Sequence, residues 1–121
     1  MANTFKVVTF AAEPASAGTA YKMYTVAGST TTVVLGLVLT NIHSSAVTAE
    51  VELVSDTGSR GGANNVTNGT SFLVKDVTIP AGSSLEFLTG GKVVMETTDY
   101  LNIDCSVADK LSGTLSIMEI T

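Results

Sequence analysis

Apolar and polar residues alternate with a period of two along much of this chain, and this pattern constrains the fold more than any other feature. In residues 111–120 (LSGTLSIMEI), leucine and isoleucine alternate with serine and threonine. In residues 47–55, Val47, Val51 and Leu53 alternate with Glu50 and Glu52. Successive side chains of a strand point to opposite faces, so both segments are predicted as strands with one buried face. Further strand signals occupy residues 5–10, 19–26, 31–42, 71–79, 84–88, 92–95 and 100–106.

Eight or nine short strands in 121 residues, separated by turns rich in glycine, are typical of an all-β protein. The pattern predicts a single-domain antiparallel β-sandwich over residues 1–121, with a jelly-roll or an immunoglobulin-like Greek-key order of strands. A single helical turn at residues 107–110 is the most helix that we expect. Gly36, in the middle of the longest predicted strand, predicts a bulge or the close approach of another backbone.

Two parts of the chain repeat the same pattern. Residues 37–53 align without a gap on residues 101–117, and their inward apolar positions coincide. We interpret the two segments as similar hairpins, one in each of two facing sheets. An internal duplication and two unrelated amphipathic hairpins both fit this pattern, and either interpretation favours a sandwich.

Two segments are candidates for contact with partners. Residues 1–18 are predicted as an N-terminal arm that adds a strand to a neighbour, and its apolar residues before Pro14 are Phe5, Val7, Val8 and Phe10. Residues 56–70 (DTGSRGGANNVTNGT) are predicted as a long exposed loop. The loop is interpreted either as a solvated connection or as a binding element, because loops of this length in compact domains often bind. Its candidate contact residues are Arg60, Asn64 and Asn65.

Charge excludes several classes of partner. Charged residues make up only 14% of the chain, against roughly 25% in an average protein, and the formal net charge is −5. The six basic residues are scattered, so we expect no direct binding of nucleic acid. The longest apolar run, at residues 33–39, is far too short to span a membrane. Residues 1–10 lack the order of a signal peptide, so we expect synthesis and folding in a cytoplasm.

The residues that carry out most enzyme chemistry are scarce. The chain has one histidine, His43, in a polar turn, and one cysteine, Cys105, inside an alternating strand. One cysteine and one histidine cannot supply four zinc ligands, and Asp99, Asp104 and Asp109 do not have the spacing of a calcium loop. We therefore expect no catalytic residues, no metal and no cofactor. His43 is interpreted as an exposed turn residue and Cys105 as part of the core.

Three longer segments carry a resemblance to a known family. They are residues 21–53, with an AGS turn and a VVLGL strand, residues 71–103, with LVKDVTIPAGSSLE and GKVVME, and residues 111–120, with SIMEI. In this order the segments resemble small virion proteins of tailed bacteriophages, notably those of marine bacteria and cyanobacteria. The resemblance covers about four fifths of the chain, and its motifs are structural rather than catalytic.

The resemblance implies a β-sandwich that is attached to a phage particle. We expect a non-enzymatic virion structural protein, a capsid decoration (cement) protein that binds the major capsid protein. The alternative is a tail, neck or fibre component, including a receptor- or glycan-binding module. A homo-oligomer is expected, with a trimer favoured because decoration proteins suit quasi-threefold lattice points. The expected location is the virion, after synthesis in the cytoplasm of the host bacterium.

Overall fold

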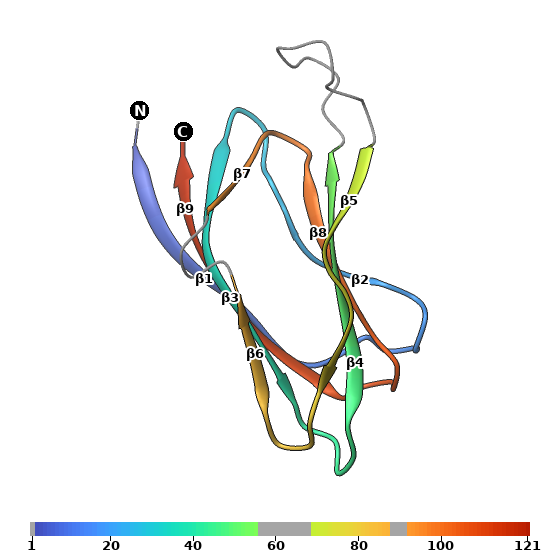
Figure 1. The fold of residues 1–121 in the computed structure, drawn as a ribbon. Helices are drawn as coiled ribbons and strands as arrows, with labels where there is room; N and C mark the ends of the chain where they lie inside the picture. The colour runs from blue at the N-terminus through green and yellow to red at the C-terminus, as the bar shows by residue number, and fades with distance from the viewer. Residues whose placement is uncertain (1, 56–68, 88–91) are drawn as a thin grey trace.

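The computed structural model describes residues 2–55, 69–87 and 92–121, and these residues form two packed antiparallel sheets (Figure 1). The described part of the chain contains strands and turns but no helix. The strands are β1 (Asn3–Glu13), β2 (Tyr21–Thr25), β3 (Thr31–Asn41), β4 (Val47–Ser55), β5 (Gly69–Ile79), β6 (Ser84–Phe87), β7 (Val93–Met95), β8 (Tyr100–Cys105) and β9 (Leu111–Ile120). Each lies on a segment predicted as a strand, so the predicted all-β sandwich is confirmed.

The order of strands decides between the two predicted topologies. The five-stranded sheet has the order β1-β9-β3-β6, with β7 also paired to β3, and the four-stranded sheet has the order β2-β8-β4-β5. Because β6 and β7 both pair with β3, they share one position in their sheet. The two sheets then have the order of an eight-stranded jelly roll, in which most consecutive strands cross from one sheet to the other.

The bulge predicted at Gly36 is present. The pairing of β3 with β9 shifts between Val34 and Gly36. Before the shift Thr32 and Val34 are buried, and after it Leu37 and Leu39 are buried, so the extra residue changes which positions face the core. A Cβ atom placed on Gly36 would meet no atom of the described residues within 4 Å, so the glycine marks the bulge and not a close backbone contact.

The two predicted hairpins are wrong. β3 and β4 belong to different sheets, and so do β8 and β9, so each repeated segment crosses the sandwich. The strands instead pair between the repeats, β3 with β9 and β4 with β8. The alternation of side chains is the same whichever strand lies alongside, so it indicates a strand without indicating its partner.

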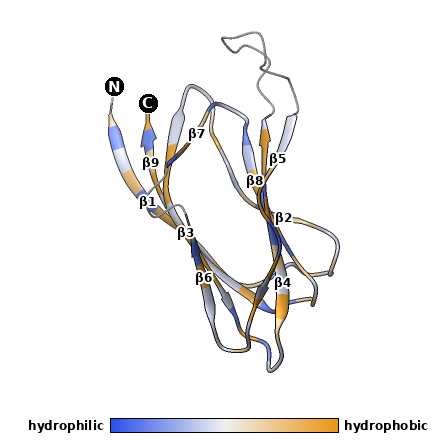
Figure 2. Cartoon of the chain, in the orientation of Figure 1, coloured by the Kyte–Doolittle hydropathy of each residue, from blue (hydrophilic) through white to orange (hydrophobic). Residues whose placement is uncertain are grey.

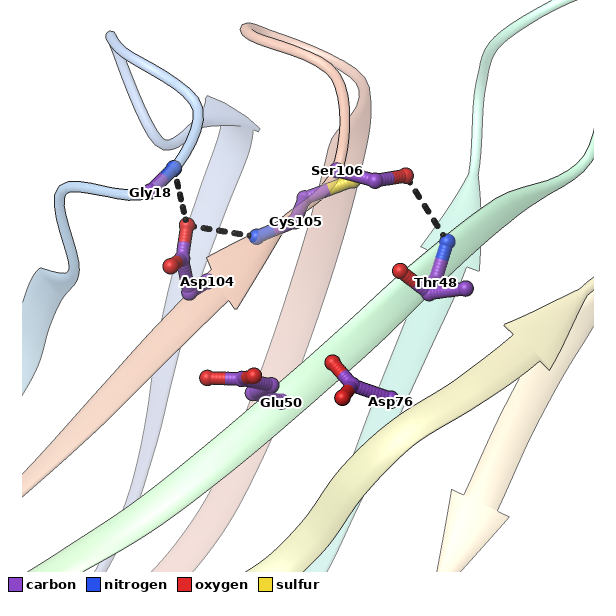
Figure 3. A pocket seen from close by; sticks show the side chains of 7 residues that line it. All are labelled: Gly18, Thr48, Glu50, Asp76, Asp104, Cys105 and Ser106. Carbon is purple, nitrogen blue, oxygen red and sulfur yellow. Dashed lines mark hydrogen bonds between the residues drawn. The ribbon is translucent and has the colours of Figure 1, made fainter.

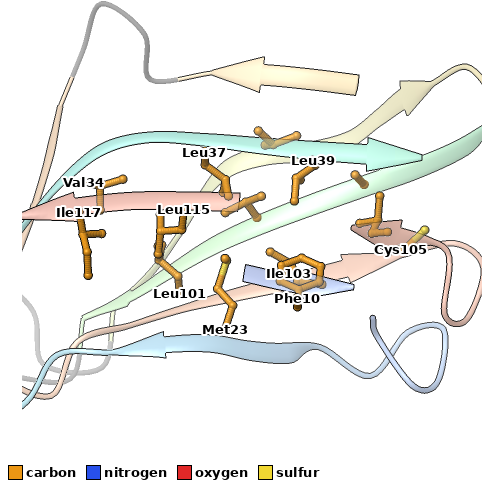
Figure 4. Packing of buried hydrophobic residues seen from close by; sticks show 14 of the residues in the cluster. Phe10, Met23, Val34, Leu37, Leu39, Leu101, Ile103, Cys105, Leu115 and Ile117 are labelled. Atoms are coloured by element: carbon orange, nitrogen blue, oxygen red, sulfur yellow. The ribbon is translucent and has the colours of Figure 1, made fainter. Parts of the chain in front are cut away.

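The core lies between the two sheets (Figure 4). Leu37, Leu115 and Ile117 project from one sheet toward Leu101 and Ile103 of the other. The inward positions predicted in residues 111–120 are all buried. In residues 47–55, Val47 and Val51 are buried, and Leu53, opposite the buried Leu101, packs against the core as predicted. Val54, on the other face of the strand, is also buried.

The N-terminal segment predicted as an arm forms an edge strand of this chain. β1 pairs with β9 from Asn3 opposite Ile120 to Phe10 opposite Gly113, and the two ends of the chain lie side by side (Figure 1). Of the predicted loop, residues 56–68 lie outside the described residues, and Gly69 and Thr70 begin β5.

Candidate docking surface

An apolar row crosses the outer face of the five-stranded sheet. Phe5 lies opposite Met118, Met118 opposite Val33, and Val33 opposite Val94, so four strands contribute one residue each. Residues opposite each other in a sheet point to the same face. Their chain neighbours Ile117 and Val34 are buried in the core, so the row points away from it. Phe5 is 72% exposed and Val94 58% exposed, while Met118 and Val33 are half-buried.

The apolar row continues into neighbouring surface. Val7 follows Phe5 on the same face of β1 and is 64% exposed. Beside the row, the bulge in β3 leaves a shallow hollow of about 470 Å³ on the sheet. The hollow is lined by Leu35, Gly36, Leu37, Val38, Glu86, Thr114 and Ser116. The outer face of this sheet therefore combines an exposed apolar row with a mostly uncharged depression.

The outer face of the four-stranded sheet has the opposite character. Glu50 lies directly opposite Asp104, and Glu52 lies opposite Asn102 on the same face. The ammonium groups of Lys22 and Lys75 lie over the rings of Tyr100 and Phe72, at 4.0 Å and 4.6 Å. On the outer face of the five-stranded sheet, Glu86 alone carries charge among the strand residues that the structure describes. Figure 2 shows how apolar and polar residues alternate along the strands of both sheets.

A second hollow, of about 220 Å³, lies on this acidic face (Figure 3). Asp104 accepts hydrogen bonds from the backbone N–H groups of Gly18 and Cys105, at 3.1 Å and 2.8 Å. Lys75 donates to Glu50 at 2.9 Å, and this hydrogen bond raises the pKa of the Lys75 ammonium. Among the described residues, no three histidine, cysteine or acidic side chains are placed to hold a metal ion. Glu50 and Asp104 are thus engaged within the chain, and Asp104 ties β8 to the turn that contains Gly18.

A polar network joins the two sheets at the edge formed by β1 and β2. The Tyr24 hydroxyl donates to Glu119 at 2.6 Å and lies 2.7 Å from the Thr32 hydroxyl. Lys6 forms an ion pair with the other carboxylate oxygen of Glu119 at 2.6 Å. Burial, followed by the hydrogen bond to Glu119, raises the pKa of Tyr24 to about 12. The Lys6 ammonium and then the Tyr24 hydroxyl lower the pKa of Glu119.

The residues predicted to contact partners fall into three groups. Phe5 and Val7 are exposed on the outer face. Val8 is half-buried, and Phe10 is only 8% exposed, with its ring packed edge-on against Tyr21 at 5.4 Å. Phe10 belongs to the core, because it lies opposite the inward-facing Gly113. Arg60, Asn64 and Asn65 lie outside the described residues.

Sequence reasoning missed three members of the apolar row, Met118, Val33 and Val94. Each sits in a predicted strand next to a core residue, so its outward direction follows from the alternation of side chains along a strand. Their alignment depends on the register of β9, β3 and β7, which no local pattern contains.

The histidine and the cysteine, which were considered as reactive groups, both lie among residues that hold the fold together. Cys105 is 3% exposed and packs in the core, as predicted. His43 lies in a turn as predicted, but it is half-buried rather than exposed, and its backbone N–H donates to the Asn41 side-chain oxygen at 2.7 Å. The described part of the chain holds no helix long and apolar enough to cross a bilayer.

Compared with known proteins, the chain matches no family model, no curated protein and no solved structure.

Proposed function

We propose that this chain is a non-enzymatic structural protein of a virion, a capsid decoration (cement) protein that binds the major capsid lattice of a tailed phage. The resemblance of residues 21–53, 71–103 and 111–120 to small phage virion proteins supports the phage particle as its location. The single observation that carries the docking role is the apolar row of Phe5, Met118, Val33 and Val94.

The apolar row favours docking because it leaves large apolar side chains in water. Single exposed apolar residues are ordinary, but contiguous apolar patches mark interaction sites. The core of a protein interface is poor in charge, as is the outer face of the five-stranded sheet. The four-stranded sheet carries Glu50, Glu52 and Asp104 on its outer face, which suits contact with water. The protein would therefore bind with the five-stranded sheet toward the capsid and the acidic sheet outward.

The geometry favours a protein partner over a glycan. Glycan sites combine exposed aromatic rings with hydrogen-bonding groups. The exposed Phe5 and Phe72 carry no such group and lie on different sheets, and the chain has three tyrosines and no tryptophan. Tyr24 is hydrogen-bonded between the sheets, Tyr21 packs on Phe10, and Lys22 lies over the ring of Tyr100. All three tyrosines are half-buried and engaged within the chain.

A particle-binding experiment tests the proposal. Capsids assembled without this chain are mixed with the purified protein and pelleted, and the bound protein is quantified against the major capsid protein. We expect saturable binding in a fixed ratio, and Val94→Glu should weaken it about tenfold or more by burying a carboxylate in the contact. Phe72→Glu, which makes the same kind of change at a 48% exposed residue of the four-stranded sheet, should bind like the wild type.

Two results would contradict the proposal. If Val94→Glu and Phe72→Glu bind equally well, the apolar row is not the docking surface. If mass spectrometry of purified particles finds only a handful of copies, the protein is a tail or neck component and not a decoration protein.

A further inference from the structure

β1 presents a long edge without a partner among the described residues. It pairs with β9 through an unbroken register of eight residues, from Asn3 to Phe10. No described strand pairs with its other side. In an antiparallel strand, alternate residues direct their N–H and C=O groups to each side, so one set of these groups faces outward along β1. Such a row is a template for pairing with another strand.

The other described edges of the two sheets have features that hinder pairing. β2 has only five residues, and its register shifts between Lys22 and Tyr24. β5 contains two register shifts, and Asp76 within it has a positive φ of 50°. β6 and β7 have four and three residues. Short strands, bulges and charges are the means by which sheet proteins prevent contact between edges.

β1 lacks these features over most of its length. It has eleven residues, and its first shift comes only after Phe10. Its exposed side chains include Phe5 and Val7. The one charge between Asn3 and Ala12 is Lys6, and Glu119 of the same chain neutralises it at 2.6 Å. A second β1 strand could therefore approach without bringing two unpaired charges together.

We infer that β1 pairs with β1 of a second copy of this chain, antiparallel and about a two-fold axis, to join two five-stranded sheets into one. An isologous contact uses the same surface on both copies, and β1 is the one described edge suited to pairing. A three-fold ring needs a head-to-tail contact, in which β1 would meet one of the hindered edges. The edge thus favours a dimer over the trimer expected from lattice symmetry. The inference concerns the purified chain and does not rest on binding to capsids.

The pairing has a specific register. The two-fold axis keeps outward residues opposite outward residues, so the central residue pairs with itself. A centre at Lys6 would oppose two lysines, whereas a centre at Val7 places Val7 against Val7 and Phe5 against Thr9. Around this centre Thr4 pairs with Phe10, so the paired stretch has seven residues and is about 24 Å long and about 10 Å thick, a strip well below the ~800 Å² per partner of a standard stable interface. We therefore expect a weak dimer with a micromolar dissociation constant.

Sedimentation equilibrium over a series of protein concentrations tests the dimer. The wild type should change from a 12.4 kDa monomer to twice that mass as concentration rises. Val7→Glu places two carboxylates opposite each other and should weaken the dimer about tenfold or more. Val94→Glu, on the same face but at the far side of the sheet, should dimerise like the wild type. Circular dichroism and thermal unfolding confirm that both variants fold.

A cross-linking experiment tests the register. Val7→Cys should form an intermolecular disulfide under mild oxidation, because its two copies meet at the axis within disulfide distance. Val94→Cys, at a residue that is also exposed, should not form this disulfide. Cys105 is buried and does not interfere. A dimer in which Val7→Cys fails to cross-link overturns this register. If the wild-type protein stays monomeric up to about 1 mM, the dimer is overturned, and the β1 edge would then pair with a strand of another protein. A trimer, or equal weakening by Val94→Glu and Val7→Glu, also overturns it.

Discussion

The Tyr24 hydroxyl on β2 donates to the Glu119 carboxylate on β9 at 2.6 Å, and this hydrogen bond joins the two sheets. The two residues are 95 positions apart in sequence. Glu119 points to the inner side of its sheet, where a charge is costly unless it has partners. Lys6, paired with Glu119 at 2.6 Å, supplies the balancing charge from the neighbouring strand. The polar network therefore closes the edge of the sandwich where β1 and β2 lie.

Removing the hydroxyl of Tyr24 should destabilise the fold. Tyr24→Phe deletes the donor to Glu119 and the contact with Thr32, and we expect a loss of about 1 to 2 kcal/mol in the free energy of unfolding. Denaturant unfolding measures this loss. Tyr100→Phe is the matched control, because the Lys22 ammonium lies over the Tyr100 ring and the Tyr100 hydroxyl forms no hydrogen bond with another described residue. Equal losses in both variants would contradict a role for the network.

The same network predicts how stability depends on pH. The pKa of Glu119 is lowered in the folded chain, so its contribution is lost as pH falls below the ordinary glutamate value of about 4.3. The pKa of Tyr24 is raised to about 12, so its contribution is lost as pH rises from about 10 through that value. The stability difference between wild type and Tyr24→Phe should be constant near neutral pH and shrink above about pH 10. If the stability difference between the two proteins instead grows above about pH 10, the predicted direction of the Tyr24 effect is wrong.

Gly113 has a steric reason to be glycine. A Cβ atom at this position would collide with the ring of Phe10. Gly113→Ala should therefore cost about 1 to 3 kcal/mol by overpacking, measured by thermal or denaturant unfolding. Phe10→Leu in the same chain should recover part of the loss. Gly36→Ala, where a Cβ meets no atom of the described part of the chain within 4 Å, should change stability by less than about 0.5 kcal/mol.

Asn41 fixes the connection between the sheets through three hydrogen bonds. Its side-chain N–H₂ donates to the carbonyls of Ser45 and Ile79, both at 2.9 Å, and its oxygen accepts from His43. Asn41→Asp replaces the donor with a carboxylate oxygen that faces two carbonyls, at a cost of about 2 to 4 kcal/mol. Protonation would restore one donor, so the variant should approach the wild type between about pH 7 and about pH 5. A pH-independent gap would contradict this explanation.

The positions of the strands could be predicted from the sequence because the alternation that indicates a strand lies within that strand. Leu111, Leu115 and Ile117 alternate with polar residues, and all three are buried as predicted. Gly36 also predicted the bulge from local sequence, because glycine weakens the interior of a strand and often marks a bulge there. Leu53 also faces the core as predicted, opposite Leu101. The two register shifts in the pairing of β4 with β5 were not predicted, because they depend on both strands.

The contact surface was only partly predictable. Phe5 and Val7 were chosen because they precede Pro14 in an apolar segment, and both are exposed. Phe10 belongs to the same segment but is covered by Tyr21 and Gly113, which are distant in sequence. The repeated segments 37–53 and 101–117 correctly predicted four strands, but the predicted pairing of these strands was wrong.

The sequence alone determined that the chain is all-β, where its strands run and which side of most strands is apolar, because side-chain alternation follows from the backbone of one strand. Tertiary structure decided which strands are neighbours, at which register they meet and which edge is left open. These depend on hydrogen bonds and packing between segments far apart in the chain. For this reason the apolar row, the Tyr24–Glu119 bond and the unpartnered edge of β1 exist only in the folded protein.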